Sequence, residues 1–388
     1  MHASPRDCRP GRRPTRVEPS TRTAAGAQAV ATKCGDIRCL ETIRLHVKLR
    51  SPGRRRDLRH TMTSQSIIST PAADSPFALS ADNSYRRWRD RKLADQPASA
   101  EDLMVEVADP LSLTAPEKDA LLHRLRRANM ALYVCPRPTA EPKSVVRTVA
   151  AQFGLGRLDF HLCAEDEGIT PLQVTDAGPR RRYIPYTSRA LNWHTDGYYN
   201  APNKPIRAFM LHCVSDAEDG GENELMDPEI AYLRLRDEDP DFIAALSHPA
   251  AMSIPANEED GTEIRGEIAG PVFSVDRGDG SLHMRYTART RSIAWRDDPV
   301  TEQAVAAVTR LLNGRGRDVL RHRLLPGQGL LTNNVLHRRA AFHDAEDGGK
   351  RRLVYRARFF DRAEGTAYRE QSSQDVAGPD QQPTVQVT

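Results

Sequence analysis

The feature that most constrains the fold of this chain is a succession of short apolar segments separated by turns, from Arg181 to the segment RRLVYRARFF at 351–360. One of them, GPVFSVDRGDGSLHMRYT at 270–287, places the turn residues DRGDGS between two alternating runs, which predicts a β-hairpin. Short strands of this kind need a second layer to bury their apolar faces. They predict one β-sandwich or jelly-roll barrel.

Helical periodicity is found in a few segments around these strands. The segment at 117–130 predicts a helix that leads into a short strand, Ala131–Val134. SVVRTVAAQFGLG at 144–156 and DPVTEQAVAAVTRLLNGRG at 298–316 predict two more helices, the second capped by Asp298 and ended by Gly314. The expected fold class is therefore mainly β with peripheral α-helices.

The charge is distributed unevenly along the chain. Met1 to Thr61 holds 15 Lys and Arg against 5 Asp and Glu, a net charge of +10, so the remainder carries −6 of the total +4. Residues 1–75 are predicted to be a disordered basic tail, and Met62 is an alternative start of translation. We expect a linker at 76–104, one domain at 105–362 and a flexible C-terminal tail at 363–388. The acidic domain disfavours nucleic acid as a partner.

The sequence has no apolar run of about 18 residues and no secretory signal, so we expect no membrane association. Six cysteines occur without a C-x-x-C pair, and three of them lie in the basic tail. This usage is typical of a reducing compartment, and the cytoplasm is the predicted location. Homo-oligomer formation stays open.

The stretch NWHTDGYYN at 192–200 contains a histidine and an aspartate two residues apart. On a strand, His194 and Asp196 point to the same face and can reach one ion. His337 and His343 are the candidates for a third ligand, and His337 is preferred because it ends an apolar strand. Two imidazoles and one carboxylate form a facial triad that suits non-haem Fe(II) and leaves three positions open. Zinc could occupy the same ligands.

The last predicted strand has two different faces. Arg352, Arg356 and Arg358 alternate with Leu353, Tyr355, Ala357 and Phe359. Three arginines on one face of a half-buried strand require anions, and a dicarboxylate would supply them through bidentate contacts. The alternative is an exposed edge strand with its charges in solvent.

Taken together, NWHTD, GGENEL, PGQGLLTNNVLHRR and RRLVYRARF resemble the taurine dioxygenase/TfdA family of Fe(II)- and 2-oxoglutarate-dependent dioxygenases. The resemblance covers roughly residues 105–362 and implies a double-stranded β-helix. It also implies Fe(II), 2-oxoglutarate as cosubstrate and O₂. The expected reaction hydroxylates an unactivated C–H bond of a small molecule and releases succinate and CO₂. Desaturation and fragmenting hydroxylation stay open.

The same resemblance implies roles for individual residues. His194, Asp196 and His337 look like the iron ligands. Arg356 looks like the arginine that grips the distal carboxylate of 2-oxoglutarate, and Arg352, with Arg351 as the alternative, looks like the one near its 1-carboxylate. Asn223 stands where the family usually has a threonine that helps to hold 2-oxoglutarate.

The substrate is less constrained. The tyrosines and arginines that flank the motif or lie in the central insert include Tyr183 and Tyr199. The five preferred candidates among them are Tyr186, Tyr198, Arg285, Tyr286 and Arg289. Arginine with tyrosine suits an anion, whereas a tyrosine cluster suits a quaternary ammonium group. Two other functions compete: a zinc-dependent hydrolase using the same three ligands, and a non-catalytic barrel-type ligand sensor.

Overall fold

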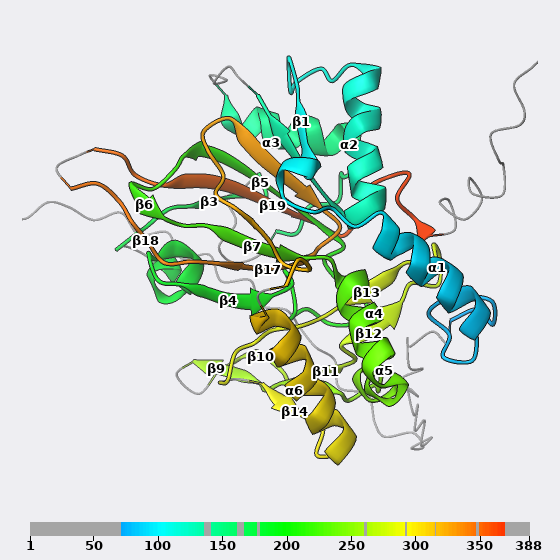
Figure 1. The fold of residues 1–388 in the computed structure, drawn as a ribbon. Coiled ribbons are helices and arrows are strands. Elements are labelled where there is room, and N and C mark those ends of the chain that lie inside the picture. Colours follow the sequence, from blue (N-terminus) through cyan, green and yellow to red (C-terminus); the bar gives the residue numbers. More distant parts are fainter. Residues whose placement is uncertain are drawn as a thin grey trace, which may run out of the picture. The chain divides into compact units, whose positions relative to one another are not determined.

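The structure, a computed structural model, describes residues 71–135, 141–160, 167–176, 179–259, 262–291, 293–314, 316–346 and 349–368. Two β-sheets face each other at its centre (Figure 1). The larger has six strands, in the spatial order β1 (Met104–Glu106), β2 (Met130–Val134), β16 (Gln328–Thr332), β5 (Ala208–Ser215), β19 (Leu353–Phe359) and β3 (Ile169–Leu172). The smaller has four, in the order β15 (Leu320–His322), β7 (Asn223–Met226), β17 (Leu336–Arg339) and β4 (Leu191–His194).

The chain passes alternately between these sheets. It runs from β4 in the smaller sheet to β5 in the larger and back to β7, and later from β16 to β17 and on to β19. This alternation is the double-stranded β-helix, so the predicted fold class is confirmed. Smaller paired strands complete the described part of the chain: β6 (Asp219–Gly220) with β18 (Phe342–His343), β8 (Met252–Ile254) with β11 (Ile268–Gly270) and β14 (Ala294–Trp295), β9 (Asn257–Glu259) with β10 (Thr262–Arg265), and β12 (Phe273–Val275) with β13 (Leu282–Met284). The β12–β13 pair is the hairpin predicted from DRGDGS.

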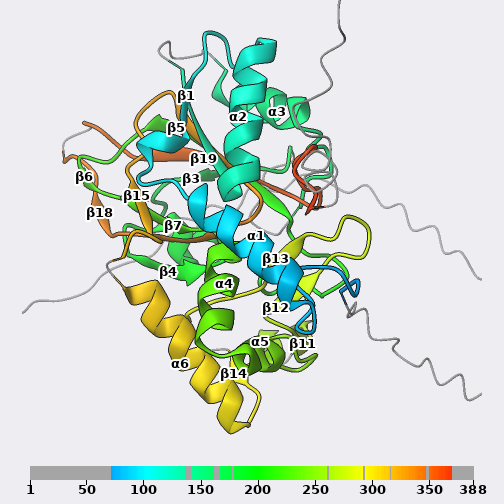
Figure 2. The same cartoon turned by 45° about the vertical axis from the view of Figure 1, so that its right-hand side comes forward.

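Six α-helices surround the sheets in the described residues (Figures 1 and 2): α1 (Asp82–Ala94), α2 (Ala115–Ala128), α3 (Pro142–Gln152), α4 (Pro228–Glu238), α5 (Pro240–Leu246) and α6 (Pro299–Asn313). Short 3₁₀ helices lie at Glu101–Leu103, Pro179–Arg182 and Ile184–Tyr186. The helices expected from periodicity are α2, α3 and α6, and Asp298 caps α6 as predicted. The sequence patterns do not predict α4, because most of its residues are buried and it lacks an alternation of polar and apolar faces.

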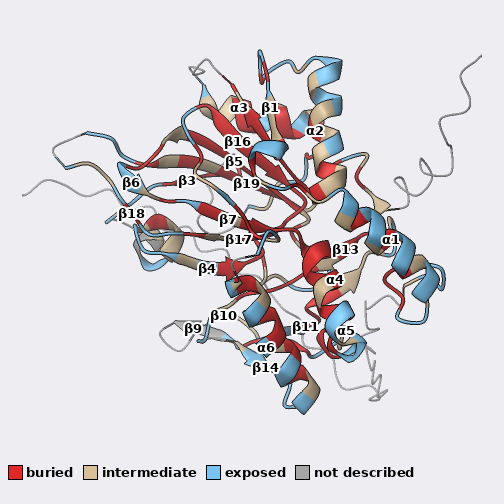
Figure 3. Ribbon diagram, in the orientation of Figure 1, coloured by how far each residue is buried: buried red, intermediate tan, exposed pale blue. Residues whose placement is uncertain are grey.

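Three hydrophobic clusters hold the layers together, and burial is concentrated along the sheets (Figure 3). Val145, Val146 and Val149 of α3 cover the outer face of the larger sheet. Phe209, Leu211 and Leu225 pack between the two sheets. Trp193, Met226 and Leu336 turn to the outer face of the smaller sheet, where α4, α5 and α6 cover them.

Residues 76–104 differ from the predicted linker. They contain α1, whose Tyr85 and Trp88 are buried against Phe77 and Tyr232. Lys92 of the same helix forms buried ion pairs with Asp227 and Glu229 at 2.7 and 2.5 Å. Most of α1 is charged, so its narrow buried stripe gives little signal in the sequence. Of the predicted tail at 1–75, residues 1–70 lie outside the described part of the chain.

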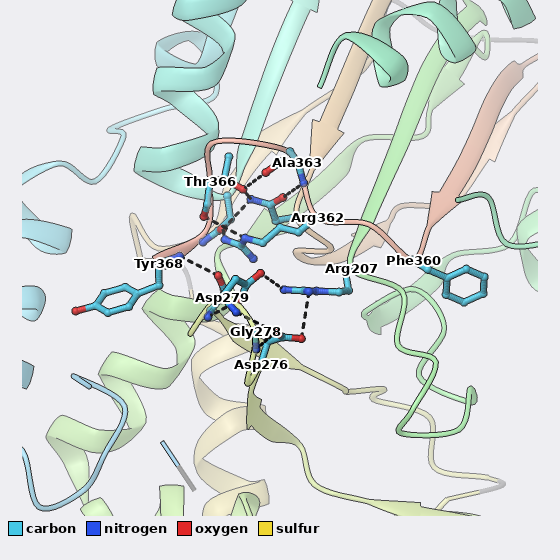
Figure 4. Close-up of polar contacts among 12 residues, drawn as sticks. Arg207, Asp276, Gly278, Asp279, Phe360, Arg362, Ala363, Thr366 and Tyr368 are labelled. Atoms are coloured by element: carbon cyan, nitrogen blue, oxygen red, sulfur yellow. Dashed lines mark hydrogen bonds and ion pairs between the residues drawn. The ribbon is translucent and has the colours of Figure 1, made fainter. Parts of the chain in front are cut away.

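The first residues of the predicted C-terminal tail are packed onto the domain (Figure 4). Thr366 is fully buried and accepts a hydrogen bond from Asn333 at 3.1 Å. The backbone N–H of Tyr368 donates to Ser281 at 3.0 Å. Nearby, Arg207 forms ion pairs with Asp276 and Asp279 of the DRGDGS turn and so ties this hairpin to the end of β19. Residues 369–388 lie outside the described range.

Within the described residues, no helix is both long and apolar enough to span a membrane.

Candidate active site

The two predicted histidines meet on neighbouring strands of the smaller sheet. His337 of β17 is the direct antiparallel partner of His194 of β4, and their ring centroids are 4.1 Å apart. Asp196 follows β4 immediately. One ligand atom from each of the three residues lies within 4.8 Å of the others. His343, the alternative third ligand, is exposed on β18 and does not belong to this cluster.

The three side chains have the properties that an Fe(II) site requires. The Nδ1 atoms of His194 and His337 bond to the carbonyl oxygens of Asn192 and Val335, at 2.8 and 3.0 Å, which leaves both Nε2 atoms for a metal. Burial lowers the pKa of His194 to about 3 and also lowers the pKa of His337, so both rings are neutral. Asp196 is buried, and its Oδ2 has no hydrogen-bond partner among the described residues. Two neutral imidazoles and a carboxylate with an unused oxygen fit Fe(II).

Arg356 lies beside this cluster. Its Nη1 donates to Asp196 Oδ1 at 3.0 Å. Burial by itself would raise the pKa of Asp196, but the guanidinium groups of Arg356 and Arg358 are the main causes that offset it, and the pKa falls well below its usual range. Asp196 therefore stays ionised and held in one orientation. The arginine face of β19 points between the sheets, as the dicarboxylate hypothesis requires, and Arg358 pairs there with Asp159 and Tyr199.

Arg352 lies farther along the same face of β19, away from the metal cluster. It is 6% exposed, whereas Arg351 is exposed, so Arg352 is the arginine that enters the interior. With Asn223 and Gly221 it lines a small cavity, and its Nη1 has no hydrogen-bond partner among the described residues. Arg356 is thus next to the metal ligands, and Arg352 lies beside Asn223, away from them. This order is the reverse of the one that the resemblance implied.

Arg339 is a residue that the sequence reasoning missed. It follows His337 by two on β17, is paired with Asn223 and is buried. Its guanidinium lies 4.7 Å from the Phe342 ring centroid, and that of Arg352 lies 5.2 Å from the same ring. Burial, with a smaller contribution from Arg352, lowers the pKa of Arg339 to about 9. The i+2 spacing from a metal ligand was the available signal, because it places both side chains on one face.

Two of the five substrate candidates lie near the metal ligands. The ring centroid of Tyr198 is 6.5 Å from that of His194. Arg289 donates from Nη1 to the Tyr198 hydroxyl at 3.0 Å. Arg289 is exposed and has no carboxylate partner among the described residues. It is therefore a cation available for an anion close to the site.

The other three candidates lie elsewhere. Arg285 donates to the carbonyl oxygens of Tyr198, Met252, Gly270 and Ile268, so a structural role accounts for its buried guanidinium. Tyr286 is on the opposite face from His194 and packs against Trp295. Tyr186 is buried in the cluster between the sheets.

Comparison with known proteins identifies a family match for this chain. The family model for taurine catabolism dioxygenase TauD, TfdA family matches residues 90–358. A uridine-5'-phosphate dioxygenase of Amycolatopsis sp is 33% identical over 171 residues, 42% of this chain and 58% of that protein. The chain thus spans less than two thirds of that relative's length. A uridine-5'-phosphate dioxygenase of Streptomyces sp is 29% identical over 252 residues, 62% of this chain and 88% of that protein.

Among solved structures, asparagine oxygenase in complex with Fe(II), 2S,3S-3-hydroxyasparagine and succinate aligns with a TM-score of 0.43. The identity is 18%, over 70% of this chain and 92% of that chain. The family match covers the strands that carry the histidine pair, Asp196 and the arginine face of β19. The chain therefore belongs to the TauD, TfdA family of Fe(II)- and 2-oxoglutarate-dependent dioxygenases.

Proposed function

We propose that this enzyme hydroxylates a C–H bond of a nucleoside 5'-phosphate at the centre formed by His194, Asp196 and His337. The buried triad carries the proposal for the reaction. The two relatives named uridine-5'-phosphate dioxygenases support the substrate class. One oxygen atom of O₂ enters the substrate and the other enters succinate, as 2-oxoglutarate loses CO₂.

Each buried residue then has a task. Bound Fe(II), with 2-oxoglutarate and O₂, supplies the oxidising power for C–H hydroxylation. His194, Asp196 and His337 hold the ion on one side and leave its other positions open. Arg356 keeps Asp196 ionised and oriented through the 3.0 Å contact. Burial between two sheets excludes water from the reacting atoms.

Arg352 and Asn223 are assigned to the distal carboxylate of 2-oxoglutarate. Arg352 is a buried guanidinium with an unpartnered Nη1, and Asn223 lines the same cavity. An unpaired buried charge is costly, and a carboxylate would satisfy it with charge-assisted hydrogen bonds. Arg339 adds positive charge at the same end of the interior.

The substrate phosphate is assigned to Arg289, which Tyr198 holds near His194. Guanidinium binds phosphate in a bidentate fork. An anionic substrate is thereby favoured over a quaternary ammonium compound. The zinc-hydrolase and sensor hypotheses leave the buried guanidinium of Arg352, whose Nη1 has no partner among the described residues, without a role. The buried free cysteine Cys213 supports a reducing compartment, and we place the enzyme in the cytoplasm.

The test is turnover of uridine 5'-monophosphate by protein loaded with Fe(II), 2-oxoglutarate and O₂. We expect succinate to form in a one-to-one ratio with oxidised nucleotide. Release of inorganic phosphate would identify the carbon that bears the phosphate ester as the site of attack, because a hydroxyl there collapses to an aldehyde. Succinate formation that does not respond to any nucleoside phosphate would contradict the substrate class but leave the dioxygenase activity intact.

A further inference from the structure

Asp196 lacks the constraint that places the other two metal ligands. His194 and His337 are ladder partners on β4 and β17, so strand register sets their positions. β4 ends at His194, and Asp196 lies in the turn that follows, where no strand of the described residues pairs with it. The backbone of Asp196 therefore needs a partner from outside the strand ladder.

The side chain of Asn334 supplies this partner. Its Oδ1 accepts a hydrogen bond from the backbone N–H of Asp196 at 2.8 Å, and its Nδ2 donates to the Asp196 carbonyl oxygen at 3.0 Å. A carboxamide carries the same kinds of donor and acceptor as a peptide group. Two residues that face each other in an antiparallel ladder exchange this same pair of bonds. The Asn334 side chain therefore continues the pairing of β4 beyond the end of the strand.

The same carboxamide also closes the loop that begins at Asp196. Nδ2 of Asn334 donates a further hydrogen bond to the carbonyl oxygen of Ile206 at 2.6 Å. Tyr198, whose ring lies near that of His194, is part of this loop. Asn334 is 2% exposed, so water does not compete for its three side-chain hydrogen bonds. One buried side chain thus holds both ends of the segment 196–206.

The turn that carries Asn334 is fixed by contacts with other elements. Asn334 has a φ of +56°, a left-handed conformation that asparagine tolerates better than most residues. Its backbone N–H donates to Thr332 Oγ1 at 3.2 Å, and this hydroxyl donates to the carbonyl oxygen of Phe209 on β5 at 3.2 Å. The Nδ2 atom of Asn333 donates to Asn129 Oδ1 at 3.1 Å. The carboxamide is therefore presented from a rigid turn.

We propose that Asn334 is a positioning residue of the metal centre, which fixes the Asp196 carboxylate relative to His337. Asn334 precedes His337 by three residues, so one short segment carries a metal ligand and the group that orients a second ligand. Arg356 contacts the carboxylate of Asp196, whereas Asn334 holds its backbone. The inference rests on the proposed centre at His194, Asp196 and His337 and is independent of the substrate.

Metal affinity measures this role without turnover. Asn334→Gly removes the carboxamide, and glycine adopts the left-handed backbone conformation without strain. Co(II), which replaces Fe(II) but resists oxidation by air, is titrated into the full-length protein by isothermal titration calorimetry. We expect binding to Asn334→Gly to be ~10–100-fold weaker than to the wild type. The visible absorption of bound Co(II) should also change, because it reports the geometry of the ligands.

Asn129→Gly is the matched control. Among the described residues, Asn129 and Asn334 are the non-glycine residues with a positive φ, and both are buried. The Asn129 side chain makes hydrogen bonds that do not reach the metal ligands, to Asp227, Asn333 and Arg362. Its loss should lower the free energy of unfolding, measured by urea denaturation, but leave the Co(II) affinity and absorption unchanged.

The possible outcomes separate this inference from the metal centre itself. Equal Co(II) affinity in the Asn334→Gly and wild-type proteins, or an equal loss of affinity in the Asn129→Gly protein, would overturn the role of Asn334 alone. A wild-type protein that binds no Co(II), or binding that His337→Ala leaves unchanged, would overturn the proposed metal centre and this inference with it.

Hydrogen exchange of the wild-type protein is a second test, which does not depend on a variant that folds. The backbone amide of Asp196 should exchange slowly in the metal-free protein, because Asn334 accepts its hydrogen bond before a metal binds. Mass spectrometry with fragmentation resolves this amide. Fast exchange that slows only after Co(II) is added would show that the metal, and not Asn334, orders Asp196.

Discussion

His337 stands directly opposite His194 in the antiparallel pair of β17 and β4, although 142 residues separate them in the sequence (337 minus 194, less one). The strand pairing sets their ring centroids 4.1 Å apart, so that the two side chains can bind one metal ion together. Asp196 completes the cluster from the turn that follows β4. The metal site is thus a product of strand register.

Replacement of His337 should abolish the metal centre. His337→Ala removes one of three ligands, and we expect turnover to fall more than ~100-fold, beyond the ~10–100-fold typical of lost supporting contacts. Formation of the metal centre is measured by the weak visible absorption of the anaerobic Fe(II)–2-oxoglutarate complex. His343→Ala is the matched control, because His343 is exposed and outside the cluster. Equal absorption from the His337→Ala and wild-type proteins would show that the third ligand is misassigned.

Arg352 and Arg356 should fail in different ways. Arg352→Ala removes the distal guanidinium, and a charged hydrogen bond worth ~1.5–3 kcal/mol predicts a KM for 2-oxoglutarate roughly 10–100-fold higher. Arg356→Ala frees Asp196 Oδ1 and should weaken Fe(II) binding instead. Arg351→Ala, an exposed neighbour, is the control. A rise in KM confined to Arg356→Ala would restore the order that the family resemblance implied.

Arg285 and Arg289 are expected to separate stability from function. Arg285→Ala leaves four backbone carbonyls without their donor, and we predict a loss of ~3–5 kcal/mol in the free energy of unfolding, measured by urea denaturation. Arg289 is exposed, so the free energy of unfolding of the Arg289→Ala protein should stay within ~0.5 kcal/mol of the wild-type value. Its KM for uridine 5'-monophosphate should rise while the KM for 2-oxoglutarate does not. An unchanged nucleotide KM would remove Arg289 from the phosphate site.

His212 should make stability sensitive to acid. Burial lowers its pKa to about 4, from an ordinary value of 6.5, and its Nδ1 lies 2.9 Å from the Tyr133 hydroxyl. In the unfolded chain the ring binds a proton near pH 6.5, but in the folded chain it does so only near pH 4. Its contribution to stability is therefore present above pH 6.5 and declines as the pH falls toward 4, by up to ~1.4 kcal/mol per unit.

Denaturation curves between pH 7 and 4.5 measure this slope. His212→Asn, which keeps a polar partner for Tyr133 but cannot titrate, should flatten it. The same slope in both proteins would mean that other groups govern the acid sensitivity.

Helix α1 should be required for stability. A chain that begins at Met62 keeps Phe77, Tyr85 and Trp88 and is expected to melt at the wild-type temperature. A chain that begins at Gln96 loses these three aromatic anchors, each worth ~3–5 kcal/mol in a core, and should be aggregated or unfolded. Thermal denaturation followed by circular dichroism compares the two. A stable chain from Gln96 would show that residues 76–95 behave as part of the linker predicted at 76–104.

Local patterns in the sequence determined the main elements of the fold. The hairpin at DRGDGS, the Asp298 cap of α6 and the strand that carries the arginines follow from turn chemistry, capping and alternation, which depend on neighbouring residues. Spacing also identified His194 and Asp196 as a pair on one face. The sequence patterns did not predict helix α1, because its few buried side chains are scattered among charged residues.

Only the tertiary structure decided which distant side chains meet. Strand register places His337, and not His343, beside His194 and Asp196. Burial identifies Arg352, and not Arg351, as the arginine that enters the interior. The contact with Asp196 placed Arg356 beside the metal ligands, whereas a strand pattern shows only that Arg352 and Arg356 share a face. Proximity across two sheets is a property of how the layers pack, and no local signal in a single sequence encodes it.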